Sequence, residues 1–242
     1  MRALGNNLPR NQLLRSLSPL DFAILAAHLE PVDLPLGFPL AVADQTVEKV
    51  YFPTHGVASL VATTRTGARA EVGMLGRDGM TGTALLLGAG RTPVETVMQI
   101  AGAGLRMTAD ALRTAMGESV SLKVSLSRYA HVAFVQSAFY ALANASVSME
   151  ARVARWLLMA HDRVDGNELV MTHERLAAML AVRRSGVTQA IHALEGQRVV
   201  RGVRGAIFVL DRPGLMSAAA GSYGRPEMEF ERLIAPLAER LA

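Results

Sequence analysis

The chain of 242 residues contains no cysteine. Disulfide bonds, iron–sulfur clusters, zinc sites with thiolate ligands and a cysteine nucleophile are therefore excluded. Lysine is also scarce, because Lys49 and Lys123 are the only lysines among 25 basic residues. Arginine presents a planar fork of five donors that suits phosphates and base edges, so this bias agrees with a nucleic-acid partner. A GC-rich genome that favours arginine codons would give the same bias.

Long apolar runs are missing as well. The longest candidate, HVAFVQSAFYALANASV, is interrupted by Gln136 and Asn144 and falls short of the roughly 18 residues that a membrane-spanning helix needs. The first residues lack the apolar segment and small-residue cleavage site of a secretion signal. We therefore expect a cytoplasmic protein that makes no membrane contact.

Patterns of metal-binding or catalytic residues are equally scarce. No two histidines have HxH or HxxxH spacing, although a single haem ligand stays open. No Ser-His-Asp order is evident, and Asp162 and Asp165 flank a turn, where we expect them in solvent. The sequence predicts no metal site, no cofactor and no enzymatic activity. The six histidines are His28, His55, His131, His161, His173 and His192.

What the chain does contain changes in character along its length. Residues 11–30 have leucines at helical spacing, and Ser18-Pro19 supplies a helix start. From Pro31 to Thr108, short apolar runs alternate with glycine and proline, and Thr66-Gly67 has the composition of a hairpin turn. This spacing predicts an antiparallel β sandwich or barrel.

A long helix is predicted next, because residues 119–160 contain neither proline nor glycine. One apolar stripe includes Leu122, Leu126 and Tyr140, whereas Phe134 and Leu142 lie on another face. A helix with two apolar faces must bury both. A second copy of the same helix in a two-fold dimer would cover the second face, and burial within the same chain is the alternative.

Residues 172–194 predict a helical hairpin. Thr172 can cap a short first helix and is also a candidate DNA contact, and residues 181–183 form the turn. In the second helix Val187, Ala190, Ile191 and Leu194 follow the spacing of one buried stripe. The opposite face carries Arg184, Ser185, Thr188, Gln189 and His192. An apolar back and a polar front are what a DNA-recognition helix requires, with Arg184 suited to guanine and Gln189 to adenine.

Two short strands around residues 202–205 follow the hairpin and predict a basic wing. Arg201 and Arg204 border its glycine-rich turn, and Arg183 begins the recognition helix. Between Arg175 and Arg204 the only acidic residue is Glu195. Positive charge without matching acid is the electrostatic footprint of phosphate binding.

The stretch ERLAAMLAVRRSGVTQAIHALEGQRVVRGVRGAIFVLDRPGL resembles the helix-turn-helix and wing of the Crp/Fnr family of bacterial transcription regulators. The resemblance covers nearly the whole chain and implies an α+β fold. Its parts would be a cyclic-nucleotide-binding-like antiparallel β jelly roll over 1–118, a dimerisation helix over 119–147, a winged helix-turn-helix over 148–220 and a helical tail over 221–242. It implies a homodimer that binds double-stranded DNA sequence-specifically and works with RNA polymerase.

By this match Arg184 takes the position of the family's base-reading arginine, with Ser185 and Gln189 at neighbouring contact positions. The best-known members carry Glu and Arg at those two positions, so we expect a different operator. Ala181 replaces the usual turn glycine; if its backbone is left-handed, alanine costs roughly 1 kcal/mol. Gly186 inside the helix costs a similar amount, roughly 1 kcal/mol.

The resemblance also places an effector pocket in GRDGMTGTALLLGAGRTPVETVMQI. Nucleotide-binding members use a Gly-Glu pair and an arginine there, but Gly82 is followed by Thr83, and Arg91 is out of register beside Pro93. An anionic phosphate without its arginine would be poorly paired, so a cyclic nucleotide is disfavoured. Another small effector, or none, stays open. The candidate pocket residues are Gly82, Thr83, Ala84, Arg91 and Thr92.

Two other functions compete with a DNA-binding regulator. One is an effector-binding module with degenerate DNA binding. The other is a cupin-like enzyme, which would need a metal-binding histidine cluster on its strands. The missing HxH spacing and the helical third of the chain count against the enzyme.

Overall fold

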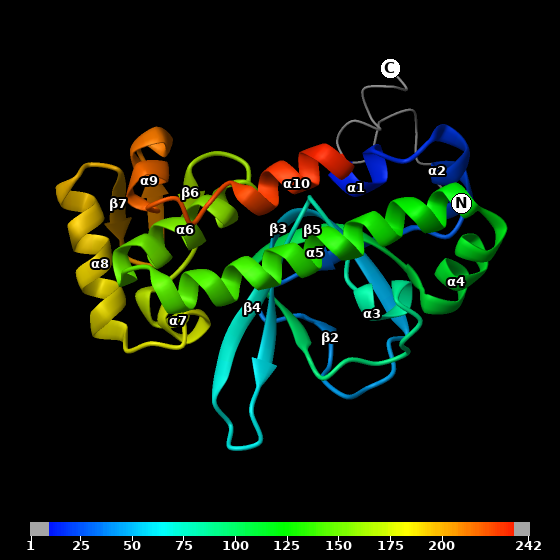
Figure 1. Cartoon of the computed structure of the whole chain (residues 1–242), viewed down its shortest axis with the longest axis horizontal. Coiled ribbons are helices and arrows are strands. Elements are labelled where there is room, and N and C mark those ends of the chain that lie inside the picture. The colour runs from blue at the N-terminus through cyan, green and yellow to red at the C-terminus, as the bar shows by residue number, and fades with distance from the viewer. Residues whose placement is uncertain (1–9, 235–242) are drawn as a thin grey trace.

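The computed structural model describes residues 10–234. A sheet-containing half and a largely helical half lie along one axis, and one long helix crosses both (Figure 1). The helices are α1 Gln12–Arg15, α2 Pro19–Ala26, α3 Thr83–Leu86, α4 Ala109–Glu118, α5 Val120–Ser146, α6 Met149–His161, α7 His173–Met179, α8 Arg184–Gly196, α9 Arg212–Ala218 and α10 Arg225–Leu233. The strands are β1 Glu30–Leu34, β2 Pro39–Ala41, β3 Lys49–Thr63, β4 Arg69–Leu75, β5 Glu95–Thr108, β6 Glu168–Leu169, β7 Val200–Val203 and β8 Ala206–Val209. The α+β class is confirmed.

The N-terminal half is built on one antiparallel sheet in the order β1-β5-β3-β4, and β2 also pairs with β5. The long strands β3 and β5 shift register three times between Pro53 and Ala58. A Cβ on Gly102 would lie only 2.0 Å from the carbonyl oxygen of His55, so this bend requires glycine. The hairpin predicted at Thr66-Gly67 is confirmed, with Gly67 at φ 89°. The β half is therefore one irregular, bent sheet.

The single helix expected over residues 11–30 is two short helices. The first helix ends at Arg15, and Ser18 caps α2, its hydroxyl accepting from the Asp21 N–H at 3.1 Å. Pro19 has no N–H and disfavours a helical conformation in the residue before it, which explains the break. Leu20 is exposed, so the leucine stripe was predicted too wide.

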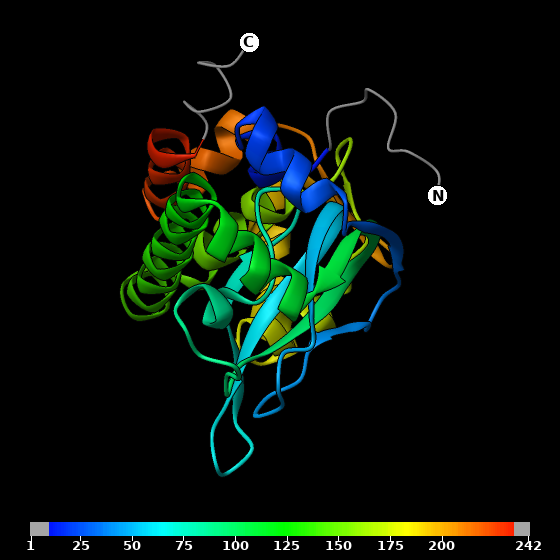
Figure 2. The same cartoon turned by 90° about the vertical axis from the view of Figure 1, so that its right-hand side faces the viewer.

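The long helix expected over 119–147 is α5, which runs from Val120 to Ser146. It begins where the Ser119 hydroxyl accepts from the Leu122 N–H at 3.1 Å. Its inner face packs on the β half, whereas Phe134 on the outer face is 71% exposed and Leu142 is 55% exposed. Helix α10 lies beside α5 on the outside of the molecule (Figures 1 and 2). An apolar strip of α5 is thus left uncovered by the described part of the chain.

The C-terminal half packs α6, α7, α8 and α9 with a three-stranded sheet in the order β6-β8-β7. Trp156 and Leu157 of α6 are buried in its core. The tail expected to be helical contains α10; Pro236, which can bend or divide a helix, lies outside the described residues. Within residues 10–234, no helix is long and apolar enough to cross a membrane.

Residues 76–79, which we term the junction loop, join the two halves at the end of α6. The Arg77 guanidinium donates to the carbonyl oxygens of Asp162 at 2.8 Å and Val164 at 2.7 Å. It also donates to the Asp165 carboxylate at 2.8 Å. A cation at the C-terminal end of a helix neutralises carbonyls that have no partner within the helix. The junction loop thereby caps a helix of the other half.

A buried ion pair completes this connection. The Nε of Arg163 donates to the Asp78 carboxylate at 2.9 Å, and the Arg163 side chain is only 4% exposed. Asp162 accepts from Arg212 at 2.6 Å and from the Tyr223 hydroxyl at 2.8 Å. The expectation of a solvated side chain was wrong for Asp162, which is half-buried. Asp165 is exposed as expected, although Arg10 and Arg77 both bind its carboxylate.

Candidate nucleic-acid interface and effector pocket

The helical hairpin forms as its local sequence predicts. The Thr172 hydroxyl caps α7 by accepting from the Arg175 N–H at 3.2 Å. Ala181, in the turn, has a φ of 53°, the left-handed conformation that its replacement of glycine suggested. The chain then closes with a bond from the Val182 N–H to the Ala177 carbonyl at 3.0 Å. The hairpin therefore contains one strained alanine at its hinge.

Helix α8 has the two faces expected of it. The residues of its inward stripe, Val187, Ala190, Ile191 and Leu194, are all buried. On the outward face Arg184, Ser185, Gln189 and His192 are exposed, and Arg183 stands exposed at the N-cap. No other part of residues 10–234 packs on this surface, so it is accessible enough to enter a DNA groove.

Thr188 is the exception on that face, because it is half-buried and shares a 3.1 Å hydrogen bond with Nδ1 of His173 on α7. Burial, followed by the positive charges of Arg184 and His192, lowers the pKa of His173. A neutral His173 can pair with the Thr188 hydroxyl without adding charge. This contact connects the two helices of the hairpin. It also engages the Thr188 hydroxyl, which was predicted to contact DNA.

The wing places two further arginines beside α8. Arg201 and Arg204 are exposed, and the Arg201 guanidinium lies 5.2 Å from the centroid of the Phe208 ring. The one acid in this region, Glu195, accepts a hydrogen bond from the Gly202 N–H at 2.7 Å. Glu195 thus fixes the wing to α8, which explains an acid among arginines.

Arg175 does not belong to this basic surface. Its guanidinium turns toward the β half and donates to the backbone carbonyl of Gln99 on β5. The basic surface is therefore smaller than sequence counting suggested. We define the recognition surface as Arg183, Arg184, Ser185, Thr188, Gln189, His192, Arg201 and Arg204.

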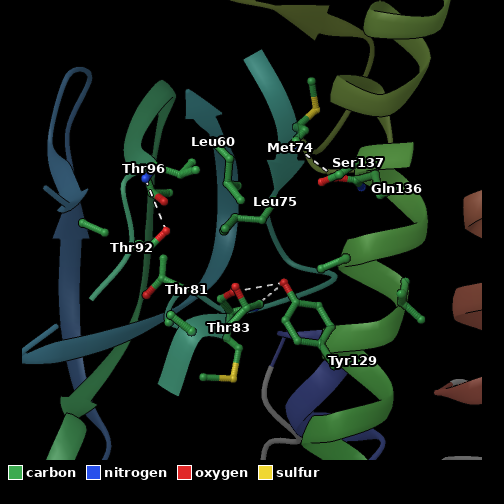
Figure 3. A pocket seen from close by; sticks show the side chains of 18 of the residues that line it. Leu60, Met74, Leu75, Thr81, Thr83, Thr92, Thr96, Tyr129, Gln136 and Ser137 are labelled. Carbon is green, nitrogen blue, oxygen red and sulfur yellow. Dashed lines mark hydrogen bonds between the residues drawn. The ribbon is translucent and has the colours of Figure 1, made fainter. Parts of the chain in front are cut away.

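A second candidate site lies in the N-terminal half, between the sheet, α3 and α5 (Figure 3). It is a cavity of about 60 Å³, which we call the inner pocket. Four of the predicted pocket residues line it: Gly82, Thr83, Ala84 and Thr92. Arg91 does not; it is exposed and makes a backbone bridge with Thr46.

Sequence reasoning missed the wall that α5 contributes to the inner pocket. Tyr129, Gln136 and Ser137 face the sheet from this helix (Figure 3). The Tyr129 hydroxyl accepts from the Met80 N–H and donates to the Met80 carbonyl, both at 3.0 Å. A Cβ on Gly79 would lie 2.1 Å from that hydroxyl, so glycine is required there. Gln136, a polar residue within an apolar helix, was the available signal.

Also missed was Glu71 on β4, which is buried beside Tyr140 of α5 and near Trp156 and Arg155 of α6. Its carboxyl group accepts from the Ser59 hydroxyl and from the Tyr140 hydroxyl, the latter at 2.7 Å. Arg155 of α6 stacks 4.2 Å above the Tyr140 ring. Burial raises the pKa of Glu71 to about 7, against the lowering effect of these hydrogen bonds. A titratable group thus sits between the two halves.

No cluster of three or more metal-ligating side chains occurs in the described ranges. A search of curated proteins gives no match. The family model of the Crp-like helix-turn-helix domain matches residues 151–218.

Several solved structures share the fold. A putative transcriptional regulator of the Crp/Fnr family from Eubacterium rectale is 17% identical, with a TM-score of 0.65, 86% of this chain covered and 98% of that chain. FixK2 from Bradyrhizobium japonicum is 16% identical, with a TM-score of 0.65 and coverage of 78% and 96%. A CRP-family transcriptional regulator from Thermus thermophilus is 16% identical, with a TM-score of 0.62 and coverage of 78% and 97%.

Proposed function

We propose that the chain is a DNA-binding transcription regulator of the Crp/Fnr type, and that it acts as a homodimer whose recognition surface reads a specific operator. Arg184 and Gln189 contact bases in the major groove, and Ser185 contacts a base or a phosphate. Arg183, Arg201 and Arg204 bind phosphates on either side. The protein works in the cytoplasm, without enzymatic activity.

The observation that carries this proposal is the exposed face of α8. Its apolar stripe is fully buried, so the helix is seated rigidly on the core. Its polar residues near the N-terminal end remain free, and the wing arginines stand beside them. A helix that only filled a core would need no cluster of exposed polar and basic side chains at its N-terminal end. The geometry instead matches a helix that inserts into a groove by its first turns.

The uncovered strip on α5 supports the dimer. Val120, Val124, Phe134 and Leu142 are exposed apolar residues, and the helix is at the outer edge of the molecule (Figure 2). A second α5 related by a two-fold axis would bury this strip against itself. The two recognition surfaces would then meet half-sites separated by about one turn of DNA.

Two partners complete the proposal. RNA polymerase is the protein partner, since a regulator at a promoter controls transcription by contacting the polymerase or by blocking it. A small effector in the inner pocket would act by favouring one arrangement of the dimer over another. The pocket supports this role because α5 forms one of its walls.

Replacing Arg184 with alanine tests DNA recognition. We expect a loss of operator affinity of about 30-fold or more, because each of the two subunits loses a bidentate base contact worth about 1–3 kcal/mol. Fluorescence anisotropy with an operator selected by the parent protein would measure it. Arg65→Ala removes an exposed arginine from the remote β3–β4 turn and should leave affinity unchanged. Equal affinity and sequence preference in Arg184→Ala and the parent would refute base reading and favour a degenerate DNA-binding half.

A further inference from the structure

The inner pocket shows which chemical class of molecule it can hold. We propose that it binds a small uncharged molecule with a hydroxyl or carbonyl group, and that this molecule joins the sheet to α5. The ligand class follows from the pocket walls alone. Only its regulatory consequence rests on the proposed function.

Charge is the first argument. The residues that line the pocket include no arginine, lysine or histidine. Its one ionisable carboxylate, Asp78, is already bound by Arg163. A phosphate or carboxylate ligand would therefore lose its hydration without gaining a cation and would approach a fixed negative charge. An ion buried without a partner is costly by several kcal/mol, so the walls select against anions.

Hydrogen-bonding capacity is the second argument. Thr83, Thr96 and Ser137 line the pocket, and their hydroxyls make no hydrogen bond to any protein group in the described chain. The Gln136 amide oxygen accepts from the Met74 N–H at 2.9 Å, which leaves its NH₂ group as a donor. These groups can donate to a carbonyl or exchange hydrogen bonds with a hydroxyl.

The remaining wall is apolar, with Leu60, Val94 and Val132 among its residues. An occupant must therefore be partly apolar itself, since it would displace water from this surface. Size narrows the class further. A cavity of about 60 Å³ is several times the roughly 10–15 Å³ that one water needs, so it suits a molecule of a few non-hydrogen atoms.

The position of these groups gives the ligand a mechanical role. Thr96 belongs to β5, Thr83 to α3 and Ser137 to α5, so one molecule can contact three elements. Phe230 of α10 adds a fourth contact. Such a ligand would stabilise the arrangement in which α5 lies against the sheet. The size of this effect is set by how much more tightly the ligand binds that arrangement than any other.

Methionine methyl groups allow a direct test, since Met74 and Met80 line the pocket and Met228 is exposed on α10. The full-length protein, labelled with ¹³C at the methionine methyls, would be titrated with 1-butanol and 2-butanone. Butyrate and cyclic AMP are the matched anionic probes. We expect the neutral probes to give saturable shifts of the Met74 and Met80 signals, with Met228 unchanged, and the anions to give none.

Two variants make the assignment specific. Thr96→Val keeps the shape of the side chain and removes its hydroxyl, and Ser137→Ala does the same on α5. Each should weaken the neutral probes about three- to tenfold, the effect of one lost hydrogen bond. Saturable pocket shifts with butyrate or cyclic AMP would overturn the proposal. So would an absence of shifts with both neutral probes, or unchanged affinity in both variants. DNA binding by the unliganded protein is measured separately, so failure of either proposal is distinguishable from failure of the other.

Discussion

The recognition surface and the inner pocket are opposites in charge and exposure. The surface presents Arg183, Arg184, Arg201 and Arg204 to solvent, and its one acid is held by a backbone N–H. The pocket is lined by threonines and apolar side chains and has no cation of its own. One end of the molecule is suited to a polyanion, and the other is suited to a small neutral molecule.

This difference explains why one end was easier to interpret from sequence. Phosphate binding requires many like charges in a short stretch, and such a stretch is visible without knowing the fold. A neutral pocket uses ordinary residue types brought together from distant segments. Ser137 and Thr96, for example, gain a shared role only after α5 packs on the sheet.

The largest effect on operator affinity should come from breaking the dimer, because this separates the two copies of the recognition surface. Phe134→Glu places a charge in the centre of the uncovered α5 strip, where a dimer would bury it. We expect a monomer in analytical ultracentrifugation and at least a 100-fold loss of operator affinity, because each half-site is then bound alone. Asn144→Glu, on a neighbouring exposed face of α5, is the control and should stay dimeric. A dimeric Phe134→Glu protein with normal affinity would show that the strip is not the interface.

The same substitution at both ends would compare them directly. Thr96→Arg buries an unpaired cation in a pocket whose threonine is 6% exposed, and we expect a loss of stability of about 3–5 kcal/mol in urea unfolding. Gln189→Arg adds the same side chain to an exposed position and should change stability by less than about 0.5 kcal/mol. Equal stability losses would contradict the contrast drawn between the two ends.

Between the two ends, Glu71 should make stability depend on pH. Burial raises its pKa to about 7, so the folded protein holds a proton that the unfolded chain releases near pH 4.5. This contribution is complete below about pH 4.5 and is lost as the pH rises through 7, by about 3 kcal/mol in total. Urea unfolding between pH 5 and pH 8 would measure it. Glu71→Gln should flatten that part of the profile, and an unchanged slope would argue against Glu71 as its source.

A smaller effect is expected at the hairpin itself, where an alanine occupies a position that favours glycine and a glycine occupies one that favours alanine. Ala181 has a left-handed backbone that favours glycine, whereas Gly186 lies in the first turn of α8 with open space around it. Ala181→Gly and Gly186→Ala should each stabilise the protein by about 1 kcal/mol, seen as a rise in thermal midpoint. Operator affinity should stay within about twofold, since neither change alters a DNA-contacting side chain. A loss of stability at either position would contradict this interpretation of the turn.

Local features of the fold were predictable from sequence. The caps at Thr172 and Ser18, the turn at Thr66-Gly67 and the left-handed Ala181 each depend on a few adjacent residues. The buried stripe of α8 was also correct in every position, because a helix repeats its faces regularly. These are the features for which neighbouring residues contain nearly all of the physical information.

Contacts across long sequence separations were not predictable. Asp78 and Arg163 are 85 residues apart, and nothing near either residue indicates its partner. The same applies to Glu71 and Tyr140, which are 69 residues apart. Arg175 was misplaced for this reason: in sequence it belongs to a basic stretch, but in space it binds the carbonyl of Gln99.

The junction loop has a consequence for how the molecule can be divided. Cutting the chain between α5 and α6 would leave Arg163 on one piece without Asp78, and the end of α6 without Arg77. A buried guanidinium that loses its carboxylate is strongly destabilising. The C-terminal half is therefore a poor independent domain, although its helix-turn-helix is complete. The chain should instead unfold as one cooperative unit. A change that destabilises one half should also destabilise the other, because this four-residue loop connects them.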